Sequence, residues 1–195
     1  MRKLIFLLAA FLPIGFCAGA DGEPVQSIVK IGYHTQSDDL NGADIDTTGF
    51  VGSFERVTSS DSFLSYYGML ALVETEASAN GVSLDLGDFE SIGFGLKYNF
   101  MNSGIEDYSE GLDKGMFYAR LGWERAKFTI SSLALQIAAN NGVPIASTSI
   151  TESGILLGLG YEKLFEQFGV YAEMMRHSED TFDDDSLNFG VFFKF

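Results

Sequence analysis

Large apolar residues alternate with small or polar residues along much of the chain. Residues 91–100, SIGFGLKYNF, show the pattern most clearly, because every second residue is large and apolar. Successive side chains of a β-strand point to opposite faces, so a period of two indicates strands with one apolar face. The alternation recurs, in places more weakly, at residues 29–33, 50–54, 117–124, 155–162, 170–174 and 187–195. In residues 63–75 both faces are apolar, so a strand is expected there without a defined facing.

The residues opposite the apolar face separate a soluble fold from a membrane fold. A soluble β-sandwich turns its large apolar face inward and covers the other face with Lys, Glu and Thr. Here the opposite face is rich in Gly and Ser with isolated charges, for example Gly95, Gly122 and Gly158, which suits a narrow lumen. Strands of about ten residues cross a bilayer at a tilt. The sequence therefore predicts an all-β fold, an eight-stranded antiparallel up-and-down transmembrane β-barrel.

Three Asn-Gly pairs mark turns between the predicted strands. They stand at residues 41–42, 80–81 and 141–142, which follow the first, third and fifth strands. Asn-Gly is the strongest short signal for a β-hairpin, because both residues tolerate positive φ. A barrel exported behind a signal begins and ends in the periplasm, so we expect these three turns to face outward. At the other end, the connection at 101–114 is rather long for a periplasmic turn.

Aromatic residues gather at the two ends of the predicted strands. Aromatic rings prefer the boundary between membrane and water, so two girdles are expected in a membrane barrel. With the facing above, the outer girdle consists of Tyr33, Phe50 and Trp123. The periplasmic girdle consists of Phe54, Tyr66, Tyr98, Phe100, Phe117, Tyr161, Phe193 and Phe195.

Residues 1–20 are predicted to be a cleaved signal peptide, and residues 21–195 the barrel domain. A short basic start precedes an apolar run over residues 4–16, and residues 18–20 read Ala-Gly-Ala. This is the pattern of a secretion signal. Cys17 also allows a lipoprotein signal, but the bulky residue before it is unusual there. The expected location is the bacterial outer membrane.

Charge and composition limit the partners. Without the signal, 10 basic residues face 27 acidic residues, a net charge of −17. This balance argues against nucleic acid or anionic lipid as the main partner. The content of 46% hydrophobic and 14% aromatic residues argues against disorder. We expect a monomeric domain in contact with outer-membrane lipid and lipopolysaccharide, with a possible extracellular protein ligand.

Eight charged residues are expected to face the lumen, four of each sign. They are Lys30, Lys97, Arg120 and Lys194, with Glu55, Glu124, Glu162 and Glu173. The interior of an eight-stranded barrel is only wide enough for side chains to fill it. The favoured hypothesis is a lumen closed by ion pairs, and the alternative is a narrow channel for ions or small solutes.

The last strand resembles a known assembly signal. Residues 188–195, NFGVFFKF, resemble the C-terminal signal of outer-membrane barrels, which ends in an aromatic residue. The matching positions are Asn188, Gly190, Phe193 and Phe195. The resemblance implies recognition by the barrel-assembly machinery during biogenesis.

Other strands resemble one family of small barrels. Residues 93–100 and 117–123 are similar to strands four and five of the opacity-protein-like family of eight-stranded porins. Ala172-Glu173 is similar to that family's penultimate strand, although Met174 and Met175 stand where aromatic or basic residues are usual. The family includes adhesins and complement-resistance factors, so the resemblance implies an architecture more than an activity.

The sequence assigns no catalytic, cofactor-binding or metal-binding residue, and no cofactor. Acidic residues gather in two outer loops, at 38–46 and 179–185, where carboxylates could hold Ca²⁺ or Mg²⁺, but a solvated charged loop is the preferred interpretation. His177 and Ser178 are similar to residues of lipid-modifying barrels. However, adjacent strand residues point to opposite faces, so this pair could not easily meet. His34 is interpreted as a histidine at a loop rim.

The segment at residues 127–151 suggests a surface role. The alternation continues past residue 128, turns at Asn141-Gly142 and returns over residues 143–150. The fifth and sixth strands are therefore expected to continue above the membrane as a hairpin with exposed backbone edges, which can recruit a further strand. A structural or adhesin-like role without enzymatic activity is the leading hypothesis for function.

Overall fold

The computed structural model describes residues 26–40, 42–58, 63–100, 108–166, 168–178 and 184–195. The predicted signal peptide at residues 1–20 lies outside the described residues.

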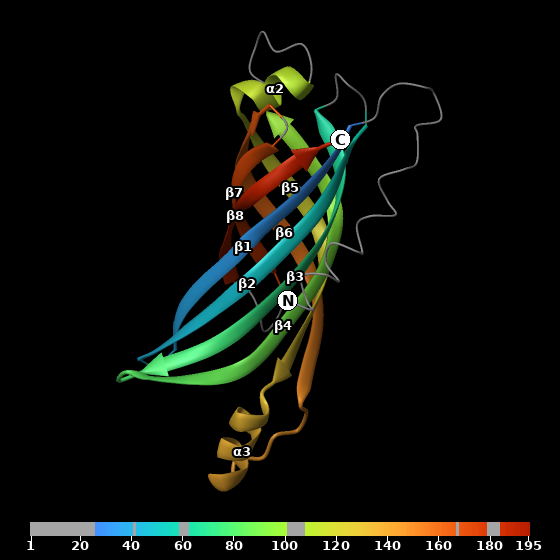
Figure 1. Ribbon diagram of the computed structural model, residues 1–195. Coiled ribbons are helices and arrows are strands. Elements are labelled where there is room, and N and C mark those ends of the chain that lie inside the picture. The colour runs from blue at the N-terminus through green and yellow to red at the C-terminus, as the bar shows by residue number, and fades with distance from the viewer. Residues whose placement is uncertain (1–25, 41, 59–62, 101–107, 167, 179–183) are drawn as a thin grey trace.

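Eight antiparallel strands form a closed barrel (Figure 1), as the alternation predicted. Each strand pairs with the next one along the chain, and β1 pairs with β8 to close the sheet. The strands are β1 Ser27–Leu40, β2 Ala43–Val57, β3 Leu64–Ala79, β4 Val82–Phe100, β5 Met116–Ile130, β6 Ser149–Phe165, β7 Phe168–Ser178 and β8 Asp184–Lys194. Two helices, α2 (Tyr108–Lys114) and α3 (Ser132–Asn140), lie in the connections on either side of β5.

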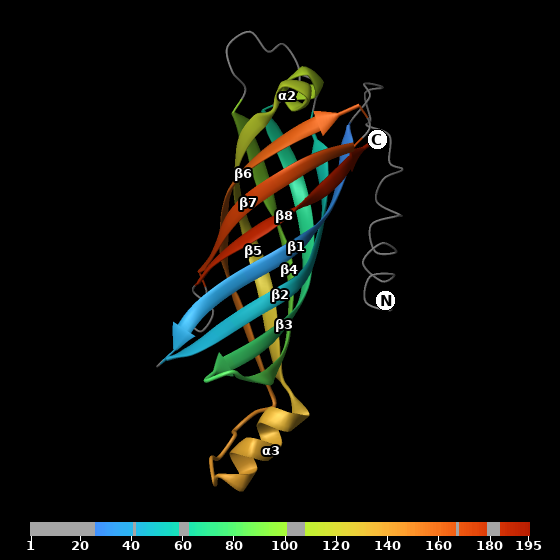
Figure 2. The same ribbon diagram turned by 60° about the vertical axis from the view of Figure 1, so that its left-hand side comes forward.

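The two helices mark opposite ends of the barrel (Figure 2). Helix α2 and the C-terminus lie at one end, called the α2 end, and α3 projects from the other, called the α3 end. In the described part of the chain, none of the helices is sufficiently long and apolar to span a bilayer.

The barrel is narrow because it has eight strands, and their register sets the tilt. Phe117 of β5 pairs directly with a residue of β6, which pairs with a residue of β7, and so on once around the barrel. This path through all eight strands returns to β5 at Lys127, ten residues farther along the chain than Phe117. Such a stagger requires all strands to tilt, and eight tilted strands enclose a space that side chains can fill. The lumen is therefore a packed core.

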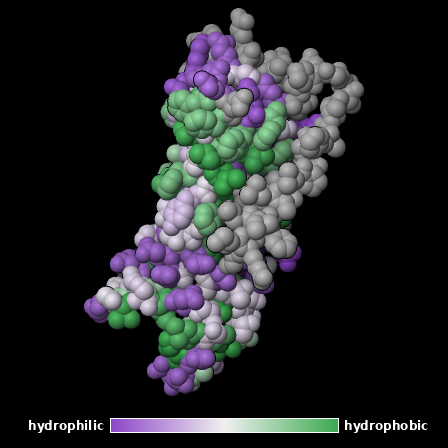
Figure 3. Space-filling model, viewed as in Figure 1, coloured by the Kyte–Doolittle hydropathy of each residue, from purple (hydrophilic) through white to green (hydrophobic). Residues whose placement is uncertain are grey.

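Side-chain facing agrees with a membrane barrel. In β4, Ile92 and Phe94 are 58% and 59% exposed, whereas Lys97 and Asn99 between the outward residues are buried. In β3, where the pattern left the facing open, Tyr67 points inward and Tyr66 outward. Figure 3 shows hydrophobic side chains gathered next to the hydrophilic α2 end. The large apolar side chains therefore form the outer surface of the barrel, where a bilayer would cover them.

The aromatic girdles are present with one exception. Tyr33, Phe50 and Trp123 are exposed toward the α3 end. Near the α2 end, Tyr161 is half-exposed and the exposed rings are Tyr66, Tyr98, Phe100, Phe117, Phe193 and Phe195. Phe54 has the outward position but is only 8% exposed, so it does not join the girdle surface.

Most strands are longer than the ten or so residues expected from the apolar alternation. β3, β4 and β6 have 16, 19 and 17 residues. The additional residues are rich in Thr, Asp, Glu and Ser, although Val82, Leu84 and Leu86 still alternate with polar residues in β4, and backbone pairing continues to the turns. Beyond the outer girdle, pairs of strands therefore extend as long hairpins.

Two of the three Asn-Gly pairs occupy hairpin turns. Asn80 and Gly81 join β3 to β4 with φ angles of 53° and 78°, the left-handed pair that a type I′ turn requires. Gly42 has a φ of 83° between β1 and β2, and Asn41 lies outside the described residues.

The third Asn-Gly pair ends a helix. The hairpin expected over residues 127–151 is therefore confirmed only where β5 and β6 pair, as far as Thr129 and Ser149, and is wrong beyond them. Gly142 has a φ of 69°; its N–H donates to the Ala139 carbonyl, and the Val143 N–H donates to the Ala138 carbonyl. These two bonds form the common glycine-terminated end of an α-helix.

Local sequence explains the helix. The Ser131 side chain accepts a hydrogen bond from the backbone of the first turn, and residues 132–140, SLALQIAAN, consist mainly of strong helix formers. The exposed strand edges expected here are therefore absent from residues 131–148, all of which the structure describes.

A charge on the outer face of the barrel tests the membrane assignment. Leu121 is 57% exposed on β5 between Phe117 and Trp123. We expect Leu121→Arg to lower the free energy of unfolding in lipid vesicles by about 2–4 kcal/mol, because the guanidinium would lie in hydrocarbon. Urea unfolding followed by the fluorescence of Trp123 measures this. The control is Val82→Arg at the tip of the β3–β4 hairpin, which we expect to change stability little; equal stability of the two variants would contradict a lipid-facing surface.

Candidate functional site

The lumen contains most of the charged residues that were expected to face it. Lys30, Lys97, Arg120, Glu55, Glu124, Glu162 and Glu173 are each at most 4% exposed. Lys194 is only partly buried at the α2 end, where its ammonium donates to the Ser109 hydroxyl of α2 at 3.1 Å. Alternation along six strands thus brings charges far apart in the sequence into one interior.

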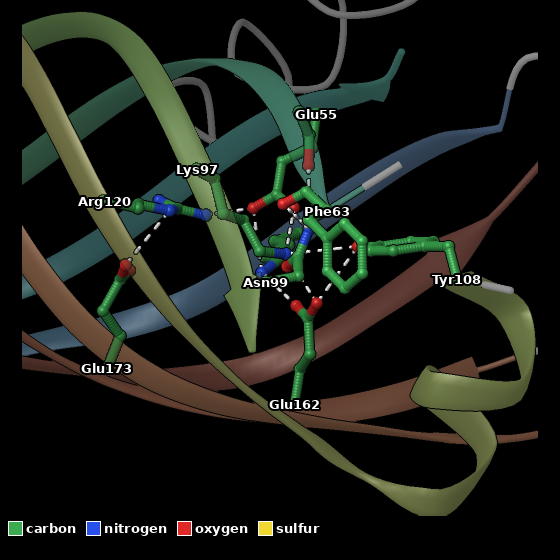
Figure 4. Close-up of polar contacts among 10 residues, drawn as sticks. Glu55, Phe63, Lys97, Asn99, Tyr108, Arg120, Glu162 and Glu173 are labelled. Atoms are coloured by element: carbon green, nitrogen blue, oxygen red, sulfur yellow. Dashed lines mark hydrogen bonds and ion pairs between the residues drawn. The ribbon is translucent and has the colours of Figure 1, made fainter. Parts of the chain in front are cut away.

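Four of these groups form a compact cluster of alternating charge. Lys30 Nζ lies 2.9 Å from Glu55 and 2.6 Å from Glu162. Lys97 Nζ lies 2.7 Å from Glu55 and 2.5 Å from Glu162 (Figure 4). Each ammonium therefore bridges the same two carboxylates. Buried charges are stable only when they are paired and hydrogen-bonded, and here each one faces two of opposite sign.

Arg120 extends the cluster along the lumen. Its guanidinium pairs with Glu55, and its Nε lies 3.1 Å from Glu173 on the far side (Figure 4). Among the described residues, the network thus balances three cations with three carboxylates. A neutral network needs no counterion from solvent, which favours a closed lumen.

Aromatic rings fill the space around these cations. The Tyr118 ring centre lies 4.5 Å from Lys30 Nζ and 4.4 Å from Lys97 Nζ. The Tyr67 ring lies 4.6 Å from the Arg120 guanidinium carbon. The negative face of an aromatic ring attracts a desolvated cation, so these contacts add to the ion pairs. They also occupy volume that water would need to cross the barrel.

Helix α2 covers one end of the lumen. The Tyr108 hydroxyl donates to Glu162 at 3.1 Å and accepts from Lys97 Nζ at 3.3 Å, so the helix joins the charged cluster directly. Leu112 packs in an apolar cluster with Ile28 and Phe192 of the barrel wall. Burial, reinforced by the Glu162 carboxylate, raises the pKa of Tyr108 well above its usual range, which keeps its hydroxyl protonated as a donor.

The long connection at 101–114 therefore has a structural reason. Its described part, from Tyr108 onward, is a helix that closes the lumen. Sequence reasoning missed Tyr108 because the residue lies outside the strands, where alternation carries no information. The excess length of the connection was the available signal.

A second polar layer lies in the lumen toward the α3 end. His177 Nδ1 contacts the Glu124 carboxylate, and His177 Nε2 lies 3.0 Å from the Ser186 hydroxyl. His34 Nδ1 lies 2.8 Å from the Asn188 side-chain oxygen. His34 is 4% exposed, so its expected position at a loop rim is wrong: the residue has the inward parity of β1.

His177 lies between a carboxylate and a serine hydroxyl, as the histidine of a hydrolase triad does, but the three groups are not accessible to a substrate. Ser186 is 3% exposed, His177 5% and Glu124 0%. A nucleophile must reach a substrate carbonyl, and these groups are enclosed by the barrel wall. Ser178, considered with His177 from the sequence, is exposed on the outside of the barrel. We therefore interpret the layer as hydrogen-bonded packing of the lumen.

The acidic residues of the outer loops are spread over the surface. Asp38, Asp39, Asp44 and Asp46 are exposed in the β1–β2 hairpin, and most of the second acidic group, at 179–185, lies outside the described residues. Among the residues that the structure describes, no group of three or more His, Cys, Asp or Glu is arranged to hold a metal ion.

The residues of the expected assembly signal occupy both faces of β8. Asn188 is buried in the lumen, and Phe193 and Phe195 are 41% and 76% exposed on the outside. Gly190 pairs with Gly32 across the β8–β1 seam, where a Cβ atom would collide with the backbone of β1. Recognition of these residues by an assembly machinery stays a prediction.

Known structures with a similar fold are small outer-membrane barrels. The attachment invasion locus protein Ail of Yersinia pestis, solved with the heparin analogue sucrose octasulfate, is 18% identical at a TM-score of 0.57, covering 88% of this chain and 99% of Ail. Ail in a phospholipid bilayer nanodisc gives 17% identity and a TM-score of 0.52, covering 88% of this chain and 100% of Ail.

Neisserial surface protein A is 16% identical at a TM-score of 0.50, covering 89% of this chain and 100% of that protein. No protein-family model and no curated protein matches the sequence. At these identities the likeness shows the fold, and it confirms the predicted similarity to small eight-stranded outer-membrane barrels.

Removing one cation tests the lumen network. We expect Lys97→Met to lower the free energy of unfolding by about 3–5 kcal/mol, because Glu55 and Glu162 lose a shared buried partner. Lys114→Met is the control, since it breaks only the exposed pair with Glu110. The double variant Lys97→Met/Glu162→Gln should recover part of the loss. Urea titration in detergent micelles measures all three, and an unchanged midpoint for Lys97→Met would refute the network.

Proposed function

We propose that this chain is an integral outer-membrane barrel without enzymatic activity that presents a binding surface outside the cell. The observation that carries the proposal is the length of the strands at the α3 end. β3 and β4 pair as far as Ala79 and Val82, well beyond the outer aromatic girdle, and β5 and β6 carry α3 farther still. A barrel that only spanned a membrane would need strands of about ten residues. The extensions therefore support a role at the surface.

The filled lumen supports the same proposal, because it opposes the passage of ions. The lumen is filled toward the α2 end by the ion network, the tyrosine rings and α2. An ion crossing it would have to separate several buried charge pairs, each stabilised in a medium of low dielectric constant. A structural and surface-interaction role is thus favoured over a narrow channel.

The proposed orientation rests on the expected export signal. With a cleaved signal at residues 1–20, both ends of the barrel domain are periplasmic, so the α3 end is outside and α2 is inside. Assembly through the signal at Asn188, Gly190, Phe193 and Phe195 and contact with lipopolysaccharide belong to the same proposal. A monomer is expected, because closing the sheet leaves no strand edge in the membrane.

The ligand of Ail in its crystal structure is a poor guide to the ligand of this chain. Sucrose octasulfate is a polyanion. The hairpins of this chain carry exposed carboxylates, including Asp38, Asp46, Glu74 and Asp85, within a chain of net charge −15. Repulsion between like charges disfavours a sulfated ligand here. The proposal therefore takes from the comparison only the architecture.

Shortening the projecting segment tests the surface role. In the variant, Asn-Gly replaces residues 131–148 and joins β5 directly to β6. We expect attachment of expressing bacteria to epithelial cells to fall by about tenfold, equivalent to about 1.4 kcal/mol of binding free energy. Attachment is counted per cell at equal surface amounts of protein, and equal attachment by variant and parent would contradict the proposal.

The orientation has its own control. Ile145→Cys and Asp113→Cys place single thiols near α3 and in α2, since the mature chain has no other cysteine. A maleimide that does not cross membranes should label Ile145→Cys on intact cells and Asp113→Cys only after permeabilisation. The reverse pattern would invert the proposed orientation.

Planar-bilayer recording tests the closed lumen. We expect purified protein to give no stable single-channel steps, because the cluster of Lys30, Lys97, Glu55 and Glu162 blocks the path. Steps of constant size that scale with protein concentration would overturn the closed lumen and favour the channel alternative.

A further inference from the structure

Helix α3 exposes an apolar face outside the barrel. In α3, all of whose residues are described, no side chain is buried. Leu133 and Ile137, one turn apart, are 48% and 40% exposed, and Val143 and Ile145 beyond the helix are 55% and 38% exposed. Figure 3 shows hydrophobic side chains over this projection. Contiguous exposed apolar residues on a projecting element are typical of an interaction site.

The projection is also uncharged. Residues 131–151 contain no Asp, Glu, Lys or Arg, although charged residues make up 20% of the chain. Helices that lie on a membrane surface usually carry Lys or Arg on the polar face and Trp or Phe on the apolar face. α3 has neither, so its composition favours a protein surface over a lipid surface. Aliphatic residues one turn apart are the pattern by which a helix enters a groove of another protein.

An acidic groove lies at the base of the helix. It has a volume of about 510 Å³ and is lined by Glu74, Glu76, Asp85 and Asp88 of the β3–β4 hairpin and by residues 129–132 of the β5–α3 junction. Four carboxylates in one groove create a strongly negative local potential. This groove fits a cationic side chain of a partner.

The helix and the groove are held in one arrangement. The Ser131 N–H donates to the Leu86 carbonyl at 2.8 Å, and the Ser131 hydroxyl donates to the Asp85 carbonyl at 2.6 Å. Ser131 is also the N-cap of α3. One residue therefore fixes the start of the helix to the hairpin that supplies the carboxylates, so the apolar face and the acidic groove form a single preorganised surface.

We propose that α3 and the acidic groove at its base together bind a partner protein that presents an apolar surface flanked by Lys or Arg. The inference rests on the proposed surface role and specifies the chemistry of its partner. Apolar contact with Leu133 and Ile137 provides burial of surface, and pairing of a partner cation with the carboxylates of the groove fixes the orientation. Charge complementarity selects this occupant over a sulfated glycan or an anionic membrane.

Binding of a designed peptide tests the surface. The probe is a short synthetic amphipathic helix of Leu and Lys, labelled with a fluorophore, added to the full chain in phosphatidylcholine nanodiscs, with empty nanodiscs as background. Two further peptides, with Leu replaced by Ser or Lys replaced by Glu, should bind about tenfold more weakly, because each lacks one half of the proposed recognition. Equal binding of the three peptides would overturn the proposal.

Paired variants locate the peptide on the protein. Leu133→Gln/Ile137→Gln and Glu76→Gln/Asp85→Asn should each weaken binding of the Leu–Lys peptide about tenfold. The matched controls are Val82→Gln, which removes an exposed apolar residue from the neighbouring tip, and Asp38→Asn/Asp46→Asn, which makes the same change in charge on the β1–β2 hairpin. The controls should bind like the parent. All positions are exposed or at the surface, and unchanged heat-modified mobility in gels verifies folding.

Two outcomes would separate this inference from the surface role itself. If the controls weaken binding as much as the site variants, attraction to the net negative charge explains the result and the proposed surface is wrong. If the same site variants also leave attachment to cells unchanged while replacement of residues 131–148 abolishes it, the surface role stands and the partner chemistry falls. The full chain in nanodiscs is also mixed with protein-free phosphatidylcholine vesicles. If it binds these vesicles, and Leu133→Gln/Ile137→Gln abolishes this binding, the partner of α3 is lipid and the proposed protein partner is wrong.

Discussion

The structure depends on one constraint: a backbone that crosses hydrocarbon must pair all of its own hydrogen-bonding groups. A sheet meets this requirement only when it closes, and here the pairing of β1 with β8 removes the last open edge. Closure of eight staggered strands leaves a narrow interior. Every strand then has one face toward lipid and one toward a crowded centre, and the remaining features of the molecule follow from what fills that centre.

The centre is filled by charges that neutralise one another. Lys30 and Lys97 share Glu55 and Glu162, and Arg120 links Glu55 to Glu173. An apolar filling would also pack. However, removal of one partner from a buried ion pair is strongly destabilising, so the network makes the native register of the strands much more stable than a shifted register. A shift of one strand by one residue would turn its charge into the membrane. The same network anchors α2 through Tyr108. One set of contacts therefore both closes the lumen and stabilises the register of the strands.

The two ends of the barrel are built differently. At the α2 end, a short helix packs its apolar side into the lumen against Ile28 and Phe192. At the α3 end, hairpins continue beyond the girdle, and α3 leaves its apolar side exposed. A helix that buries its apolar side completes a core, whereas one that exposes it is available for a partner. This contrast is the physical basis for assigning closure to one end and binding to the other.

The sequence by itself determined the class of fold and the facing of most side chains. In a strand with lipid on one side, apolar and polar residues must alternate, and this period of two can be read within each strand without knowledge of its neighbours. Residues 91–100 and 187–195 are examples. The tertiary structure alone decided which charges meet: Lys97 and Glu162 are 65 positions apart, and only closure and stagger bring them to one point. It also decided that Asn141-Gly142 ends a helix while Asn80-Gly81 closes a hairpin. The glycine has positive φ in both pairs, but Asn80 has a φ of 53° and Asn141 a φ of −94°, a difference set by how the flanking residues pair. Tyr108 escaped sequence reasoning for the same reason, because a residue outside the strands acquires its role from the lumen that it covers.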